Sequence, residues 1–193
     1  MSITFNVAPV DVVNEALGQL GKDFITDLDD TLDPVAVKAK QYFGTMLRTM
    51  LRDHDWNFAR SRVSLAQSAT APVSGYAYSY PLPGTCFFVR RLNGSDQVEW
   101  KIEGRNLFTD EATAIIEFTV WVDDPNLWDG AFHQAFVTML AVRFAPAFHS
   151  DMKKADELYK LAIQQLWDAK AIDGQEGSQD RMECTELTED IRE

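Results

Sequence analysis

Apolar residues recur at helical spacing near both ends of the chain and alternate with polar residues in its middle. Recurrence every three to four residues is typical of an amphipathic helix, whereas strict alternation is typical of a half-buried strand. The pattern therefore predicts helices within residues 1–56 and 123–172, and strands and turns within residues 57–122. Residues 173–193 follow neither period and form a tail of different composition.

Two helices are predicted in the first zone. The first begins at Pro9, where a missing N–H costs nothing, and ends near Gly21. The second begins at Asp33-Pro34, where a capping side chain precedes a proline at the first helical position. One apolar stripe runs along this second helix: Ala39, Tyr42, Phe43, Met46, Leu47, Met50 and Leu51.

Alternation in the middle zone predicts a small antiparallel sheet inserted between the helices. The alternating runs are residues 98–102 and 114–122. Asn93-Gly94 follows an apolar run that starts at Cys86, and this dipeptide favours a tight turn between strands. We therefore expect a β-hairpin over residues 86–102.

A third helix, over residues 125–148, is predicted to open at Asp124-Pro125 and is apolar on most sides. It is not predicted to span a membrane, because Arg143 and two other polar residues interrupt the apolar run. A span needs about 20 nearly uncharged residues. We expect instead a central helix that is buried within the fold.

A fourth helix is predicted from near Ser150 to near Gly174. Its apolar stripe consists of Ala155, Leu158, Ala162, Leu166 and Ala169. The resulting fold class is α+β: a bundle of about four helices with an inserted small antiparallel β-sheet and an acidic C-terminal tail. The expected domains are a helical domain (1–56 and 123–172), an inserted β domain (57–122) and a tail (173–193).

Charge and cysteine content narrow the class of protein. The chain has 193 residues, with 30 acidic and 18 basic side chains and a net charge of −12. Proteins that coat DNA neutralise phosphates with a basic surface, so this charge argues against that class. Cys86 and Cys184 lie far apart in the sequence and are expected to be free thiols in a reducing compartment. No secretory signal is expected, because the N-terminus lacks a basic start before an apolar run.

No motif for catalysis or metal binding stands out. His54, His133 and His149 have no partners at metal-ligand spacing and are expected to be ordinary polar residues. The aspartates within residues 27–33 do not fit a calcium loop, because glycine and glutamate are missing where such a loop needs them. A solvated turn with a helix cap explains these aspartates better. Paired carboxylates for glycoside hydrolysis remain open, because 30 acidic residues always include pairs.

Three tyrosines, Tyr76, Tyr78 and Tyr80, lie on one side of an extended segment. Such rings can stack on the bases of a single strand, but stacking platforms sit in basic grooves. The local cations are Arg60, Arg62, Arg90 and Arg91. Because the chain as a whole is acidic, we expect these tyrosines to form a packed sheet face.

Several stretches, read in order, resemble one family. They are EALGQLG at 15–21, HDWNFAR at 54–60, YAYSYPLP at 76–83, IEGRNLFTDE at 102–111, a strand ending in VDDP, and DGQEGS at 173–178. Together they are similar to the tail tubular protein A family, the head–tail adaptors of short-tailed bacteriophages. The resemblance extends from about Val10 to about Met182. The family pattern usually has proline where this chain has Asp55, and often a Phe-Asp-Pro group where this chain has residues 127–130.

The resemblance implies a structural virion protein and not an enzyme, with no cofactor. Such adaptors form a homo-oligomeric ring, by family expectation a dodecamer, that joins the portal protein to the tail nozzle, a tail tubular protein B-like protein. Genomic DNA passes transiently through the lumen of the ring during ejection. The implied location is the head–tail junction of the virion, after synthesis in the host cytoplasm, with no membrane partner. A tail-associated glycan hydrolase and a DNA-binding module are the alternatives.

Two sets of candidate contact residues follow. Candidate anchors of the core or of an interface are Trp56, Phe58, Tyr76, Tyr78, Tyr80, Trp121 and Trp128. Candidate portal-docking residues are Met182, Leu187 and Ile191, which lie at roughly helical spacing in a charged tail. The tail has eight acidic residues and two arginines, a net charge of −6, which is half of the total. A solubilising disordered end is the plainer interpretation of this tail, and docking is the functional hypothesis.

Overall fold

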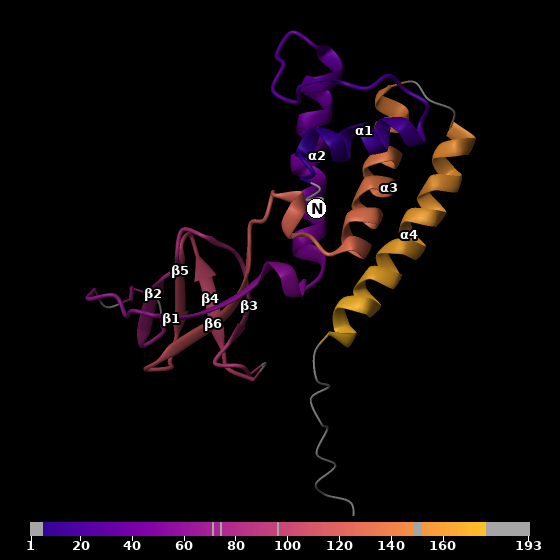
Figure 1. Cartoon of the computed structure of the whole chain (residues 1–193). Helices are drawn as coiled ribbons and strands as arrows, with labels where there is room; N and C mark the ends of the chain where they lie inside the picture. Colours follow the sequence, from indigo (N-terminus) through magenta and orange to yellow (C-terminus); the bar gives the residue numbers. More distant parts are fainter. Residues whose placement is uncertain (1–5, 71, 74, 96, 149–151, 177–193) are drawn as a thin grey trace, which may run out of the picture.

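The computed structural model describes residues 6–70, 72–73, 75–95, 97–148 and 152–176. Within these residues the chain forms four α-helices and six β-strands in an α+β fold, which confirms the predicted class (Figure 1). The elements are α1 (Pro9–Gln19), α2 (Pro34–Asp53), η1 (Asn57–Ala59), β1 (Arg60–Leu65), β2 (Tyr78–Pro81), β3 (Cys86–Leu92), β4 (Trp100–Glu103), β5 (Asn106–Thr109), β6 (Ala114–Val120), η2 (Pro125–Leu127), α3 (Gly130–Ala147) and α4 (Met152–Gln175).

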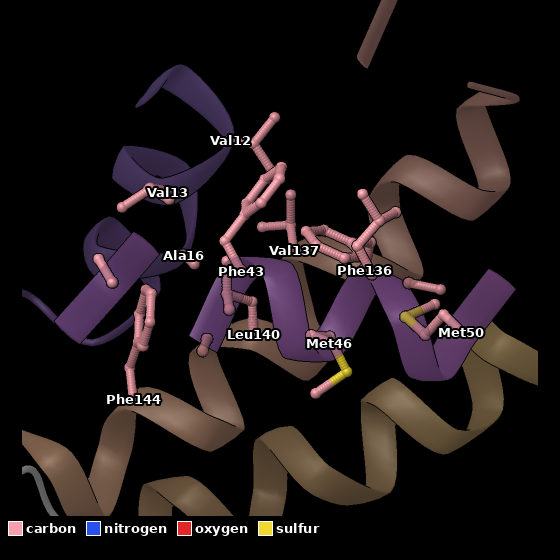
Figure 2. Packing of buried hydrophobic residues seen from close by; sticks show 14 of the residues in the cluster. Val12, Val13, Ala16, Phe43, Met46, Met50, Phe136, Val137, Leu140 and Phe144 are labelled. Carbon is pink, nitrogen blue, oxygen red and sulfur yellow. The ribbon is translucent and has the colours of Figure 1, made fainter. Parts of the chain in front are cut away.

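The first two helices begin where the sequence predicts. Pro9 is the first residue of α1, and Gly21 follows its end with a positive φ of 66° that suits glycine. Asp33 caps α2 by accepting a hydrogen bond from the Val35 amide at 2.8 Å. The predicted apolar stripe of α2 faces the core, with Phe43, Met46 and Met50 among its buried residues (Figure 2).

Helix α3 is the central element of the helical part, and it packs against each of the other three helices. Its buried residues include Phe136, Val137, Leu140 and Phe144, which contact α1 and α2 side chains in one continuous cluster (Figure 2). The predicted central buried helix is thereby confirmed. Of the helices that the structure describes, none has the length and apolar character needed to cross a membrane.

The predicted start of α3 is wrong by about one turn. Asp124 and Pro125 open the separate short turn η2, in which the Asp124 carboxylate accepts from the Asn126 amide at 3.0 Å. The helix itself begins at Gly130, because Asp129 caps it by accepting from the Ala131 amide at 2.8 Å. Two Asp caps follow one another here, and the sequence pattern does not distinguish which one the long helix uses.

The strands form two three-stranded antiparallel sheets, ordered β1-β6-β3 and β2-β5-β4. The predicted hairpin over residues 86–102 is wrong, because β3 pairs with β6 whereas β4 pairs with β5. Asn93 does form a turn, with φ of 52°, but its side chain bonds to the start of β6. Its Oδ1 accepts from the Ile115 amide at 2.8 Å, and its Nδ2 donates to the Thr113 carbonyl at 3.0 Å. These bonds hold the end of β3 beside β6.

Buried apolar residues form two clusters. One lies among the helices, and the other lies between the two sheets around Tyr80, Leu107 and Ile116. The segment 57–122, predicted as an inserted β domain, contains all six described strands. Helix α4 continues through Asp173 to Gln175, so its described end lies beyond the point where the sequence analysis begins the tail.

Candidate interaction surfaces

The HDWNFAR segment, residues 54–60, lies where the end of α2, the end of α4 and the sheets meet. Asp173, only 5% exposed, accepts from the Asn57 amide at 2.8 Å, and its other carboxylate oxygen lies 2.9 Å from His54 Nε2. The Asn57 side chain donates to the Asp173 carbonyl at 2.6 Å. Residues from two of the motifs that carry the family resemblance, 119 positions apart, therefore hold each other in place.

Arg90 of β3 connects the same junction to the sheets. Its guanidinium donates to the carbonyls of Leu51 and His54 at 2.6 Å each and to that of Arg52 at 3.0 Å. Its Nε donates to Thr119 Oγ1 at 2.8 Å. Burial lowers the pKa of Arg90 below its ordinary value, and the nearby Asp55 carboxylate opposes that shift. A cation at the carboxyl end of α2 satisfies carbonyls that the helix itself leaves unpaired.

Three of the predicted anchors belong to the helical core. Trp56 donates its indole N–H to the Met50 carbonyl at 2.8 Å, and Phe58 packs edge-on against Phe132 at 4.9 Å between ring centroids. Trp128 donates to the Val122 carbonyl at 3.0 Å. Because Trp56 and Trp128 are almost fully buried and Phe58 is partly covered, all three contribute to the subunit's own packing.

The tyrosine segment divides between core and surface. Tyr80 is 1% exposed and donates its hydroxyl to the Glu111 carbonyl at 2.8 Å, and burial raises its pKa. Tyr78 packs against the same cluster, whereas Tyr76 precedes β2 and is half-buried. The predicted packed sheet face is therefore confirmed for Tyr78 and Tyr80.

Arginines near the tyrosines are engaged within the chain. Arg60 pairs with Asp55 at 3.0 Å, and Arg62 pairs with Glu117. Arg90 donates hydrogen bonds to carbonyls at the end of α2. Trp121, the remaining predicted anchor, is half-buried between Phe87 and the Arg48 guanidinium, which lies 5.4 Å from a Trp121 ring centroid. These contacts place the cations on aromatic rings, carbonyls and carboxylates of the same chain.

The acidic loop before α2 uses its carboxylates locally. Asp27 accepts from the Asp29 amide and Asp30 from the Leu32 amide, each at 2.8 Å, and Asp29 pairs with Lys40. The predicted turn and helix cap are confirmed. Among the described residues, no group of histidine, cysteine and acidic side chains is arranged to hold a metal ion.

The histidines also take structural partners. His54 contacts Asp173, and His133 Nε2 lies 3.0 Å from Glu15 Oε2. His149, the remaining histidine, lies outside the described residues, as do Cys184 and the portal-docking candidates Met182, Leu187 and Ile191. Cys86 is a buried free thiol.

The sequence analysis missed an exposed aromatic face on α4. Tyr159, Ile163 and Trp167 recur every four residues, and Trp167 and Tyr159 are 69% and 52% exposed. Lys160 and Lys170 belong to the same side of the helix, and the Lys170 ammonium lies 5.7 Å from the Trp167 ring centroid. The four-residue spacing of these residues is visible in the sequence. It lies next to the alanine-rich stripe that the same helix buries, and the spacing alone does not indicate a function. We call these five residues the α4 face.

A groove of about 650 Å³ lies on another part of the helical body. It is lined by the start of α1, residues 26–29, the middle of α2 and residues 121–125. The apolar contributors include Val10, Leu28, Phe43 and Trp121, which are buried or half-buried, while the acidic contributors Asp27, Asp29, Asp123 and Asp124 are exposed. We call this feature the acid-rimmed groove. Hydrogen bonds from Asn126 hold the pKa of the Asp124 carboxyl below its ordinary value.

Comparison with protein-family models gives no match for this chain, and comparison with curated proteins gives no significant match.

Proposed function

We propose that this chain is the subunit of a head-to-tail adaptor ring in a short-tailed bacteriophage. The ring joins the portal protein to the tail nozzle and forms part of the conduit through which the genome is ejected. Its activity is assembly and sealing, and it performs no catalysis.

The observation that carries this proposal is the way the family-like motifs pair with one another. The YAYSYPLP segment lies against the IEGRNLFTDE segment, with Tyr80 opposite Leu107 in paired strands. The HDWNFAR segment holds Asp173 at the start of DGQEGS. Contacts of this kind stabilise the scaffold of the fold. An assembly subunit needs such a scaffold, whereas a catalytic role for these motifs would not explain why they contact one another.

The exposed features favour assembly as well. The α4 face exposes Trp167 and Tyr159, and the acid-rimmed groove is a hollow with an apolar lining. Exposed apolar features that group in this way mark interaction sites. A closed ring is built from a heterologous contact, in which one surface meets a different surface on the next subunit.

The direct test measures mass with and without the portal protein encoded in the same genome. We expect the purified chain to be a monomer or a weak oligomer alone, and to add a ring of this chain to preassembled portal rings. Mass photometry gives the stoichiometry, and electron microscopy locates the added density. Failure to bind the portal at micromolar concentrations contradicts the proposal, whereas a stable ring formed without portal contradicts only the templating.

The proposal includes docking of the portal by Met182, Leu187 and Ile191. A chain ending at Glu176 retains Asp173 and every described contact of α4. We expect it to keep the full-length far-ultraviolet circular dichroism and melting temperature while losing portal binding. The matched control replaces Glu183, Glu186 and Glu189 by glutamine, which changes the charge of the tail and keeps its apolar residues. Unchanged portal binding by the shortened chain contradicts the docking role.

A further inference from the structure

We propose that the α4 face of one subunit binds in the acid-rimmed groove of a second copy of this chain. The inference rests on the proposed function, since a ring needs a head-to-tail contact between copies, and it assigns that contact to named residues. Trp167 is the central anchor of the face, and the apolar lining around Phe43 and Trp121 receives it.

The first argument is the cost of leaving Trp167 in water. Of the five tryptophans in the chain, Trp56 and Trp128 are buried and Trp100 and Trp121 are half-buried, whereas Trp167 is 69% exposed. An exposed tryptophan with a neighbouring tyrosine offers a large apolar area on rigid helical backbone. Such residues dominate binding energy when a partner desolvates them.

The second argument is Gly44, which lines the groove from the middle of α2. Glycine inside a helix is less favourable than alanine, because it loses more backbone freedom on folding. A Cβ at Gly44 would approach no neighbouring part of the chain within 4 Å, so packing within the subunit does not explain this residue. The missing side chain leaves space in the groove, where an incoming side chain from another molecule can lie close to the α2 backbone.

The third argument is charge. The rim carries Asp27, Asp29, Asp123 and Asp124 against a single lysine, Lys40, whereas the α4 face carries Lys160 beside Trp167. Lys170, on the same face, is paired with Asp53 of its own chain at 2.5 Å. One acidic residue, Asp156, lies at the amino-terminal end of that face. An apolar anchor beside Lys160 fits an apolar groove flanked by aspartates, and complementary potentials specify the partner and its orientation.

The fourth argument is placement. Figure 1 shows α4 at one edge of the helical body, while η2 and the segment leading into it lie beyond α2 at the opposite edge. Two complementary surfaces on opposite edges cannot satisfy each other within one subunit. They generate a head-to-tail contact, which closes into a ring when the rotation between subunits permits.

Sedimentation equilibrium of the full-length chain tests this contact. We expect weak self-association that Trp167→Ala and Gly44→Leu each reduce by about tenfold or more, because one removes the anchor and the other fills its space. Leu161→Ala and Gly44→Ala are the matched controls. Leu161 is an exposed apolar residue on a different side of α4, and alanine at position 44 leaves most of the groove open. Both controls are expected to associate as the parent chain does.

A mixing experiment separates a head-to-tail contact from a symmetric one. The Trp167→Ala chain keeps an intact groove, and the Gly44→Leu chain keeps an intact α4 face. Mixed in equal amounts, they are expected to form one-to-one pairs with the affinity of the parent contact and to grow no further. Absence of such pairs overturns the inference, as does a parent chain that stays monomeric up to about 1 mM.

Cross-linking supplies the location of the contact. A photoreactive benzoylphenylalanine at position 167 is expected to label residues 26–29, 43–44 or 121–125 of another copy. Labelling confined to other segments overturns the inference while leaving portal binding unaffected. Conversely, a chain that self-associates through the groove but never binds the portal contradicts the proposed function and leaves this interface standing.

Discussion

Asp173 shows how one side chain can fix two distant segments. Its carboxylate accepts from the Asn57 amide and contacts His54, and its backbone carbonyl accepts from the Asn57 side chain. The residue belongs to the last turns of α4, while its partners follow the end of α2. A buried carboxylate with several partners is costly to remove, because each partner loses its hydrogen bond without regaining water.

Asp173→Ala is therefore expected to lower the free energy of unfolding by about 1–3 kcal/mol. For a chain of this size, that loss corresponds to a fall in melting temperature of about 2–12 °C. Differential scanning calorimetry measures it, with Asp168→Ala as the control on an exposed part of the same helix. Equal melting temperatures for the two variants would show that the junction contributes nothing to stability.

Cys86 is expected to make the free energy of unfolding depend on pH in the alkaline range. Burial raises the pKa of this thiol, with Arg105 as a smaller opposing influence, so the folded chain keeps the proton that the unfolded chain releases above about pH 8.5. Its contribution to stability is full below that pH and is lost as pH rises toward the folded pKa. Urea titrations between pH 8 and about 9.5, below the ordinary pKa of tyrosine, should show this decline, and Cys86→Ala should flatten it. A parallel decline in the variant would assign the effect to other groups.

Side chains of one element satisfy the unpaired carbonyls at the end of another element. Helix α2 finishes at Asp53, and the carbonyls at and beyond its last turn accept from Arg90, which β3 supplies. The strand thereby caps the helix, and the Asp55 carboxylate lies 3.8 Å from the same guanidinium. This planar fork of donors joins β3 to the end of α2, and lysine does not reproduce it.

Arg90→Lys is expected to lower the free energy of unfolding by about 1–3 kcal/mol, because a lysine ammonium cannot reach all of these carbonyls together. Arg62→Lys is the matched control. The Arg62 side chain is 66% exposed and pairs with the buried Glu117, and a lysine ammonium can still pair with that carboxylate, so a smaller loss is expected. Guanidinium chloride unfolding of both variants gives the comparison, and equal losses would contradict the capping role of Arg90.

At the scale of the whole molecule, the net charge of −12 is unevenly distributed. Half of it lies in the final 21 residues, where eight acidic residues outnumber two arginines. In the rest of the chain, several arginines near the sheets are occupied by carboxylates, carbonyls and aromatic rings. A conduit built from such subunits would repel DNA and let it slide.

The full-length chain is accordingly expected not to retain duplex DNA at physiological salt, because binding depends on cations that displace condensed counterions. Fluorescence anisotropy of a labelled 30-base-pair duplex, titrated at 150 mM and at 20 mM salt, checks this expectation. Saturable binding at 150 mM would favour the DNA-binding module over the adaptor.

The sequence by itself determined the local features of this protein. Asp33-Pro34 determines the start of α2, and the apolar stripes determine which faces of α2 and α4 are buried. The alternation of apolar and polar residues locates β6. These features are predictable because a helix cap and a hydrophobic period depend only on residues close together in the sequence. Tertiary structure decided what depends on distant neighbours. The turn at Asn93 suits more than one partner for β3, and the hydrogen bonds of its side chain to the start of β6 decide the pairing. Asp173 acquires its role from contacts with His54 and Asn57. Trp167 is exposed because no other described element covers that side of α4. Burial and pairing are properties of two surfaces together, and a pattern along one segment specifies only one of them.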